Sequence, residues 1–452
     1  MALQAPEGTK DLLPDEAVYW TRFKAIATEI FGRYGYLPIE TPVFEQTELF
    51  VRGIGEATDV VSKEMFTAIS GENLKKLLDG GTVKAKSRLS LRPEGTAGVV
   101  RAVVQHDLVP QWAAPAKLLY AGPMFRAERP QKGRQRQFNQ VGIECLGAEE
   151  PSVDAEGIIM LMRFYAAIGI PVEATRLLVN SMGCDACRPA YRDAVKAFMD
   201  AHIDELCDEC KRRAETNPLR AFDCKNPGCA AVMEGAPKIT DHLCDDCREH
   251  YEAVKTYLTG AGLVFVEDPT LVRGLDYYTR TVFEVQVTEG MGSQNAIGGG
   301  GRYDKLAEEV GGRPTPGFGW ALGYERCVLA LEAAGHTLPA AQRCDVFVAC
   351  VDDSVRAEAF LLVQALRDGG LVGEMDHQRR SLKSQFKLAD KLGAHAVVVL
   401  GPDELAAGQV KVRDMQEHDE QMVDLAAFKT QLVACAAEGG AAALKDVLAR
   451  LA

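Results

Sequence analysis

In residues 118–146, LLYAGPMFRAERPQKGRQRQFNQVGIECL, two apolar runs flank a polar and strongly basic loop. This pattern predicts a long antiparallel hairpin. Successive side chains of its second arm should point to opposite faces of a sheet. The mostly apolar face, which should pack on a helix, consists of Asn139, Val141, Ile143 and Cys145. The other face consists of Phe138, Gln140, Gly142 and Glu144. The glycine in this polar face should leave room for a ligand to lie against the sheet.

The loop of this hairpin is rich in cations. Arg126 ends the first arm, and the loop then carries Glu128, Arg129, Lys132, Arg134 and Arg136. A planar guanidinium grips phosphate oxygens through two hydrogen bonds, so such a loop suits a polyanion. A solvated hairpin tip is the alternative interpretation. The adjoining polar face argues against it, because a buried glutamine or glutamate is costly without a partner.

Apolar spacing elsewhere predicts further helices and strands. Residues 14–34 have helical spacing, and an extended segment follows Gly35. Residues 89–104 begin as a short strand that breaks at Pro93, and a helix should start at Thr96, either as its N-cap or as a ligand contact. The remaining predicted elements are a helix over 150–170, a strand ending at Gly183, and a glycine-rich turn into a helix over 297–312. That turn lacks the GK[ST] ending of a P-loop.

The last part of the chain has a different pattern. After a plausible linker over 335–343, apolar runs alternate with amphipathic helices, which predicts a small α/β domain with its own core. A helix is expected from Ser381. Basic residues recur there every four positions, which would place them along one side of a helix, as an RNA-binding face or as an ordinary solvated one. They are Arg379, Lys383, Lys387 and Lys391.

Length and charge limit the number of domains and the classes of protein to which this chain can belong. A chain of 452 residues suggests about three domains. Neither an apolar run of ~18 residues nor the apolar segment of a signal peptide is present, so we expect no membrane span and a cytoplasmic location. The formal net charge of −13 excludes a protein coated in basic surface. It still allows local basic patches that bind nucleic acid.

Cysteines are concentrated in one stretch. Eight of the thirteen lie between residues 184 and 247. Their spacing gives the pairs Cys184–Cys187, Cys207–Cys210, Cys224–Cys229 and Cys244–Cys247. Two-residue spacing lets two thiolates reach one tetrahedral ion, so one or two structural zinc ions are expected. Free buried thiols in a helical insert are the alternative.

The hairpin segment FRAERPQKGRQRQFNQVGIE resembles the second signature motif of class II aminoacyl-tRNA synthetases, in the form found in the histidine–tRNA ligase family. RGLDYY at 273–278, GGRYD within 297–312 and GYER within 317–331 resemble further motifs of that family in the right order. The resemblance spans essentially the whole chain. It implies an antiparallel class II catalytic sheet flanked by helices, a helical cysteine-rich insertion and a C-terminal α/β anticodon-binding domain. The implied ranges are 1–183 and 263–334 for the catalytic core, 184–262 for the insertion and 344–452 for the last domain.

The resemblance also implies an activity with ATP, Mg²⁺, L-histidine and the family's tRNA as reactants. Arg126 and Arg273 would bind the α-phosphate. The histidine site would comprise Glu94, Gly95, Thr96, Gln140, Glu144, Tyr277, Tyr278 and Tyr303. Glu128, Arg134 and Arg326 would hold the rest of ATP. Arg129, Lys132, Arg379, Lys383 and Lys387 would contact tRNA.

Two further expectations follow from the resemblance. Residues 14–45, with Pro42, resemble the first class II motif, which implies a homodimer. Asn139 departs from the family, which often has an aromatic residue or histidine there, and little effect is expected. The rival interpretation is a synthetase-like regulatory subunit of ATP phosphoribosyltransferase. Such relatives lack the C-terminal domain and much of the arginine set.

Overall fold

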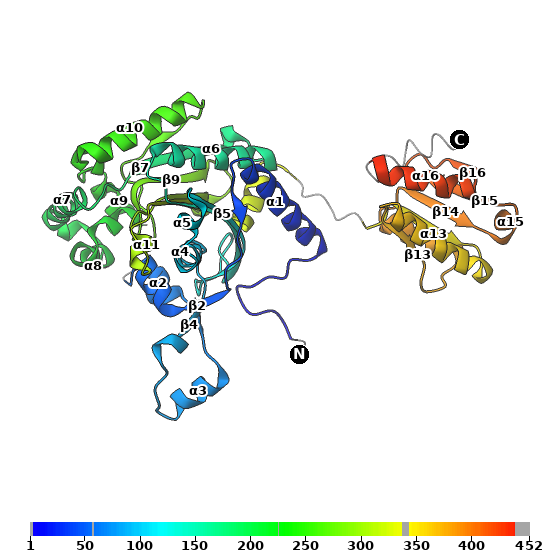
Figure 1. The fold of residues 1–452 in the computed structure, drawn as a ribbon, viewed down its shortest axis with the longest axis horizontal. Helices are drawn as coiled ribbons and strands as arrows, with labels where there is room; N and C mark the ends of the chain where they lie inside the picture. The colour runs from blue at the N-terminus through cyan, green and yellow to red at the C-terminus, as the bar shows by residue number, and fades with distance from the viewer. Residues whose placement is uncertain (1–2, 57, 225, 337–342, 439–452) are drawn as a thin grey trace. The chain divides into compact units, whose positions relative to one another are not determined.

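The computed structural model describes residues 3–56, 58–224, 226–336 and 343–438 (Figure 1). The chain forms two compact units, Met1–Pro339 and Ala340–Ala452, and each is described by itself. Within the described residues, none of the helices has the length and apolar character needed to cross a membrane.

The first unit is built on an eight-stranded sheet. Its strands, in spatial order, are β1 (Leu37–Pro38), β5 (Ala116–Phe125), β6 (Gln137–Leu146), β11 (Gly317–Gly323), β10 (Ala296–Arg302), β9 (Thr279–Val287), β7 (Thr175–Ser181) and β8 (Val266–Glu267). The six inner strands pair antiparallel, whereas β1 and β8 add parallel edges. This confirms the expected mixed fold with an antiparallel sheet at its centre.

The predicted hairpin is confirmed as β5 and β6. They pair without interruption from Ala116 opposite Leu146 to Phe125 opposite Gln137. The apolar face of β6 packs as predicted, because Val141, Ile143 and Cys145 are fully buried in the main core. The same core takes in side chains of the neighbouring strands and of the cysteine-rich segment, and four long helices pack on it: α1 (Pro14–Gly32), α6 (Pro151–Ile168), α10 (Asp245–Gly260) and α12 (Tyr324–Ala333).

The opposite face of the sheet is covered by shorter elements. Here α4 (Thr96–Gln105) and α11 (Leu306–Glu309) pack on side chains of β5 and β9. Nearby lie α2 (Thr47–Ile54), α5 (Leu108–Trp112) and a small sheet of β2 (Phe44–Gln46), β4 (Leu89–Leu91) and β3 (Thr67–Ala68). From this small sheet an arm carrying α3 (Gly71–Leu78) projects away from the body (Figure 1).

The glycine-rich segment corrects the sequence-based expectation of a turn. Residues 296–302 form β10, a central strand paired with β9 and β11. At Gly300 a Cβ atom would lie 2.1 Å from the carbonyl oxygen of Gly319, and at Gly301 one would lie 2.3 Å from that of Thr281. The glycines are therefore required by the close approach of neighbouring strands. Strand propensity alone does not reveal this, because glycine usually weakens a strand.

The space above Gly142 also differs from expectation. A Cβ there would lie 2.4 Å from the ring of Tyr120, and a Cβ at Gly95 would lie 2.2 Å from the same ring. Tyr120 is thus sandwiched between two glycines, and its ring fills the room that was expected to be open for a ligand.

The cysteine-rich segment lies between β7 and α10. It contains α7 (Arg188–Ala201), α8 (Asp208–Thr216), a 3₁₀ turn over Pro218–Asp223 and α9 (Pro227–Met233). Figure 1 shows these green helices together at one side of the sheet, next to α10. The helix α10 packs along α6, which joins the segment to the main core.

The second unit has a five-stranded sheet in the order β13 (Gly373–Met375), β12 (Val346–Cys350), β14 (Ala396–Leu400), β15 (Gln409–Asp414) and β16 (Glu420–Asp424). The first three strands are parallel, and the last two add antiparallel. The helices are α13 (Arg356–Asp368), α14 (Leu382–Lys391), α15 (Pro402–Ala406) and α16 (Leu425–Glu438). The predicted strand–helix alternation is confirmed through β14, whereas β15 and β16 were not predicted. Most of the expected linker, residues 337–342, lies outside the described residues.

Arg379 does not lie on the helix face on which the four-residue spacing of basic residues placed it. Ser381 is the N-cap of α14, so Lys383, Lys387 and Lys391 are helical and exposed. Arg379 precedes the helix with φ +52 and pairs with Asp353 at 3.4 Å. The four-residue repeat therefore extends to a residue before the helix begins. Outside a helix, this spacing no longer places side chains on one face.

Candidate active site

A cavity of about 190 Å³ opens on the sheet where the hairpin loop, β9, β10 and β11 meet. Four arginines from three distant parts of the chain line it: Arg126 and Arg134 of the hairpin loop, Arg273 and Arg326. Carboxylates of Glu128, Glu284 and Glu325, together with Gln140 and Phe138, complete its polar walls. A cavity walled by so many guanidinium groups suits an anion with several oxygens.

The floor of the cavity is glycine backbone. Gly298 and Gly299 of β10 line it. A Cβ at Gly299 would lie 2.9 Å from Nη1 of Arg273, and one at Gly298 would lie 2.4 Å from the Tyr165 hydroxyl. Glycine at position 299 therefore lets Arg273 and a ligand approach the sheet directly, whereas glycine at 298 makes room for Tyr165 on the core face.

Arg326 stands in the first turn of α12, and three hydrogen bonds hold its side chain. Its guanidinium donates to the carbonyls of Ala296 at 2.8 Å and Gly133 at 3.1 Å, and to Oε1 of Gln294 at 3.1 Å. Arg134 donates to the same Gln294 oxygen at 2.9 Å. Burial, then the positive charges of Arg134 and Arg126, lower the pKa of Arg326. This mutual repulsion would be relieved by a bound anion.

Arg126 and Arg273 are fixed on other walls. Nε of Arg126 donates to the carbonyl of Pro93 at 3.0 Å, and its guanidinium lies over the ring of Phe138 at 5.3 Å. Arg273 pairs through Nη1 with Glu284 at 2.6 Å. Such partners hold planar guanidinium groups in place before a ligand arrives, which is what electrostatic catalysis requires.

Two buried carboxylates lie close to this cavity. Glu94 is 4% exposed and Glu144 is fully buried, and neither forms a salt bridge within the described residues. Burial raises the pKa of both carboxyl groups, most strongly that of Glu144. Glu94 accepts the N–H groups of Thr96 at 2.6 Å and Ala97 at 2.9 Å. It therefore caps α4 itself, with Gly95 at the N-cap position, and Thr96 is not the N-cap.

Around Glu144 several buried polar atoms have no hydrogen-bond partner in the described part of the chain. They are Oε1 of Glu144, Oε1 of Gln140 and the hydroxyl of Tyr120. Buried polar atoms are normally satisfied, so these three oxygens are available to pair with a polar ligand. The other oxygen of Glu144 accepts the hydroxyl of Tyr303.

The predicted tyrosines gather beside these acids. The ring centroids of Tyr277 and Tyr278 are 4.6 Å apart, and Tyr303 lies 5.6 Å from Tyr277. All three are buried. They form a buried cluster with Glu94 and Glu144 and do not line the arginine-walled cavity, whereas Tyr278 borders a second cavity on the side of the cysteine-rich segment. Gln140 and Arg273 connect the two regions, because both line the cavity and Gln140 shares β6 with Glu144.

Several residues of the site were missed by sequence reasoning. Glu284 and Gln294 hold the arginines, and the amide groups of Asn139 donate to Glu325 at 3.0 Å. Strand alternation in β9 would have placed Glu284 beside the glycines, but only after β9 was paired with β10. Arg129 and Lys132 lie on the loop outside this cavity, beside two neighbouring hollows.

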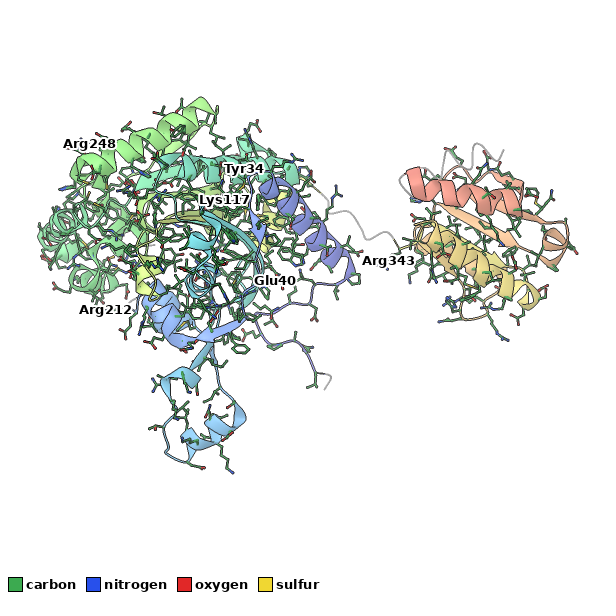
Figure 2. All side chains as sticks on the ribbon, in the orientation of Figure 1. Tyr34, Glu40, Lys117, Arg212, Arg248 and Arg343 are labelled. Atoms are coloured by element: carbon green, nitrogen blue, oxygen red, sulfur yellow. The ribbon has the colours of Figure 1, made fainter. Side chains whose placement is uncertain are left out.

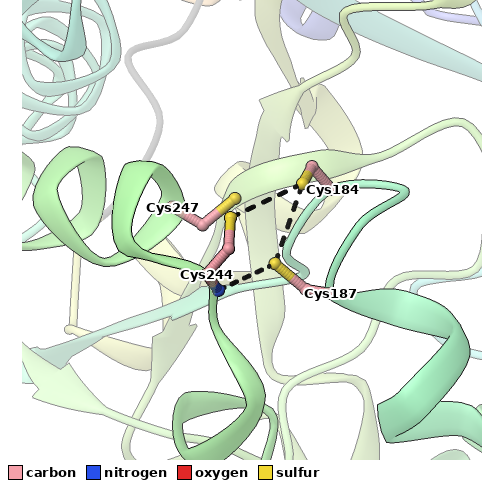
Figure 3. Close-up of side chains that lie close together, drawn as sticks. All are labelled: Cys184, Cys187, Cys244 and Cys247. Carbon is pink, nitrogen blue, oxygen red and sulfur yellow. Dashed lines mark hydrogen bonds between the residues drawn. The ribbon is translucent and has the colours of Figure 1, made fainter.

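The eight paired cysteines form two separate clusters. Cys184, Cys187, Cys244 and Cys247 make the first, and Cys207, Cys210, Cys224 and Cys229 make the second. In the first (Figure 3) the sulfur of Cys184 lies 3.7 Å from that of Cys187 and 3.8 Å from that of Cys244. In the second, the sulfurs of Cys207 and Cys224 are 3.8 Å apart. A tetrahedral zinc with Zn–S bonds of ~2.3 Å has sulfur–sulfur edges of ~3.8 Å, so both donor sets fit this ion.

One thiol in each cluster has a lowered pKa, whereas burial raises the pKa of Cys210, Cys229 and Cys247. Burial raises the pKa of Cys184, but hydrogen bonds from the N–H groups of Ala186 and Cys187 outweigh it and bring that pKa down to about 7. The N–H of Cys210 likewise lowers the pKa of Cys207 to about 7. Metals bind thiolates, so a depressed thiol pKa favours binding.

Comparison with known proteins identifies the relatives of this chain. Residues 8–327 match the family described as Histidyl-tRNA synthetase, and residues 345–434 match the family described as Anticodon binding domain. The histidine–tRNA ligase of Moorella thermoacetica is 45% identical over 427 residues, which cover 94% of this chain and 97% of that protein. The apo structure of S. aureus histidyl-tRNA synthetase superposes with a TM-score of 0.78 at 35% identity, covering 96% of this chain and all of that one.

A third relative bears on the rival interpretation. The Bacillus halodurans structure titled an ATP phosphoribosyltransferase regulatory subunit/histidyl-tRNA synthetase superposes with a TM-score of 0.59. It is 19% identical and covers 89% of this chain and 99% of its own. At this identity the likeness concerns the fold alone.

Proposed function

This chain belongs to the histidyl-tRNA synthetase family of class II aminoacyl-tRNA synthetases, and from that premise we propose how its residues carry out histidine–tRNA ligation. The reaction joins L-histidine to ATP as histidyl-adenylate and then transfers histidine to the terminal adenosine of its tRNA. The observation that supports this assignment most is the meeting of four arginines from three distant segments in one cavity, beside two buried acids that form no salt bridge within the described residues.

In the first step an oxygen of the histidine carboxylate attacks the α-phosphorus of ATP. The bond from phosphorus to the bridging oxygen breaks, and that oxygen leaves with pyrophosphate. Negative charge grows on the phosphoryl oxygens, and we assign Arg126 and Arg273 to stabilise it. The substrate supplies its own nucleophile, so positioning and charge stabilisation account for most of the rate.

The other end of ATP we assign to Arg134 and Arg326, whose shared positive charge needs an anion. Glu128 and Glu284 are the residues we assign to magnesium, because carboxylate oxygens are ligands that it prefers and both line the cavity. When bound, the ion neutralises charge on the phosphate oxygens.

Histidine itself we assign to the cluster around Glu94, Thr96 and Glu144, with Gln140 at its entrance. A buried carboxylate without a cation is costly, and the substrate's ammonium or imidazole group would supply the missing charge. The hydroxyls of Tyr277, Tyr278 and Tyr303 offer further partners to a polar ring. Because this cluster is closed in the present structure, we infer that histidine opens it on binding.

The test is pyrophosphate exchange with each of the twenty amino acids, followed by tRNA charging. We expect exchange that depends on histidine and on no other amino acid. A protein with no histidine-dependent exchange would instead behave as the non-catalytic regulatory relatives do. Exchange without charging of tRNA would point to another acceptor.

For tRNA we propose two contact regions. Lys383 and Lys387 on α14 would grip the anticodon stem-loop together with Arg379, because residues 345–434 match an anticodon-binding domain. Arg129 and Lys132 on the hairpin loop would meet the acceptor end. Reversing the charge of Lys383 and Lys387 should therefore weaken charging while leaving pyrophosphate exchange unchanged.

We further propose a homodimer in the cytoplasm, where tRNA is charged. The exposed apolar side chains of Leu37, Val43 and Phe44 lie on the segment that resembles the first class II motif. A dimer would bury them, and sedimentation of the intact chain would detect it. Catalysis is assigned to 1–183 and 263–334, the insertion to 184–262 and anticodon binding to 344–452.

We also propose one structural zinc ion in each cysteine cluster. Elemental analysis of the untagged protein should find about two zinc ions per chain. Cys184→Ser should lose one of them, and Cys207→Ser should lose the other. A metal-free protein that folds normally would show that these are ordinary buried thiols.

A further inference from the structure

The RGLDYY segment, residues 273–278, is held from the side of the insertion by two arginines. Arg188 donates from Nη2 to the carbonyl of Tyr278. Arg220 donates from Nη2 to the carbonyl of Gly274 at 2.9 Å and lies 3.5 Å from the carboxylate of Asp276. These contacts reach both ends of a short segment that carries Arg273 and the tyrosine pair.

Arg188 is next in sequence to a cysteine of the first cluster, and Arg220 lies in the short turn that leads to a cysteine of the second. Arg188 follows Cys187 and begins α7, and its N–H donates to the carbonyl of Cys184 at 2.9 Å. Arg220 lies in the 3₁₀ turn that ends immediately before Cys224. Arg213 of α8 donates to the carbonyl of Arg220 at 2.8 Å. The position of each guanidinium therefore depends on the geometry of its cluster.

The segment needs such support because it borders open space. A cavity of about 480 Å³ separates it from the insertion, and Arg188, Arg220, Arg273 and Tyr278 line that cavity. On the other side, the N–H of Asp276 donates to the carbonyl of Ile54 at 3.2 Å. The tyrosines of this segment are buried, but its backbone is irregular and faces a cavity, so specific hydrogen bonds are needed to fix its conformation.

Arg188 is a costly choice for a purely structural contact. Its buried Nε has no hydrogen-bond partner in the described residues. Desolvating a guanidinium without satisfying all its donors lowers stability. The compensation is a charge-assisted hydrogen bond, which fixes the carbonyl of Tyr278 more firmly than a neutral donor would.

From these contacts we propose that the two cysteine clusters brace the histidine-binding segment, with Arg188 and Arg220 as positioning residues. Metal in the first cluster fixes the position of Arg188, and metal in the second fixes the position of Arg220. The two arginines together hold residues 273–278 in the conformation that recognises histidine. This inference rests on the proposed function and on metal in the clusters. It extends the role of the insertion's metals from local folding to amino-acid affinity.

The test compares Arg188→Ala and Arg220→Ala with Arg212→Ala. Arg212 is a matched control on α8 (Figure 2), exposed and, among the described residues, in an ion pair with Glu209 alone. Each bracing variant should raise the KM for histidine at least ~10-fold, the scale for losing a charge-assisted hydrogen bond, with the KM for ATP changed less than ~2-fold. Arg188→Lys should recover part of the loss. Calorimetric titration with histidine alone should show the same weakening without any turnover.

Removal of the metal is the second experiment. Chelation of the intact enzyme should weaken histidine binding in the same titration, and zinc should restore it. Unchanged histidine affinity in Arg188→Ala and Arg220→Ala, or an equal rise in both KM values, would overturn the bracing role. Tight histidine binding by metal-free protein would overturn the role of the metal. Wild-type protein without histidine-dependent exchange would instead refute the proposed function.

Discussion

Arg273→Ala should slow formation of histidyl-adenylate at least ~10²-fold, the scale for losing one preorganised charge-stabilising donor. The side chain lies on the cavity wall and its Nη1 is held by Glu284 at 2.6 Å. Removing it takes away a positive charge where the phosphoryl oxygens become more negative, and it leaves Glu284 facing them unpaired. Single-turnover measurement of adenylate formation reports this step without interference from product release.

Three further variants separate these effects. Glu284→Gln alone measures what this assigned magnesium ligand contributes, and Arg273→Ala combined with Glu284→Gln removes the unpaired acid. A double variant slower than Glu284→Gln alone shows that the guanidinium itself is needed. Arg273→Lys keeps a charge but loses the planar pair of donors, so its rate of adenylate formation should fall between those of the wild type and Arg273→Ala. A rate for Arg273→Ala equal to that of the wild type would remove Arg273 from the catalytic machinery.

Gly300→Ala should destabilise the first unit by about 3 kcal/mol or more, the range for overpacking a buried site. The added Cβ would lie 2.1 Å from the carbonyl oxygen of Gly319 and 2.5 Å from Cα of Trp320. Both are backbone atoms of the paired strand, so the strands must separate. We expect the thermal unfolding midpoint of this unit to fall by about 6 °C or more.

Gly260→Ala is the matched control. Gly260 is the last residue of α10, and a Cβ there meets nothing within 4 Å. Alanine is the better helix former by up to ~1 kcal/mol, so this variant should be neutral or slightly more stable. If Gly300→Ala unfolds at the same temperature as Gly260→Ala, the strands around Gly300 are not as closely packed as they are here.

The local pattern of the sequence was sufficient for the hairpin. Apolar alternation located β5 and β6 and identified which side chains of β6 enter the core, because side-chain direction in a strand depends only on position parity. The same pattern failed at residues 297–302. Glycine carries no side chain to alternate, so nothing in the sequence distinguished a central strand from a turn.

Spacing alone also misled in two other places. Arg379 continues the basic repeat of α14 but lies before the helix, in a left-handed backbone conformation. Gly142 was expected to face an empty space, and Tyr120 fills it from the neighbouring strand. In both cases the deciding contact comes from outside the repeat, and a periodic pattern carries no information about it.

The sequence by itself determined the chemistry that is available: a basic loop, polar residues on one strand face, paired cysteines and a separate α/β unit. Only the tertiary structure decided which of these groups meet. It joined Arg126, Arg134, Arg273 and Arg326 in one cavity, and it paired Cys184 and Cys187 with Cys244 and Cys247 rather than with the nearer pair at 207 and 210. The physical reason is that helical and strand periods are set by neighbouring residues, whereas strand order and cluster partners are set by burial between segments distant in the chain.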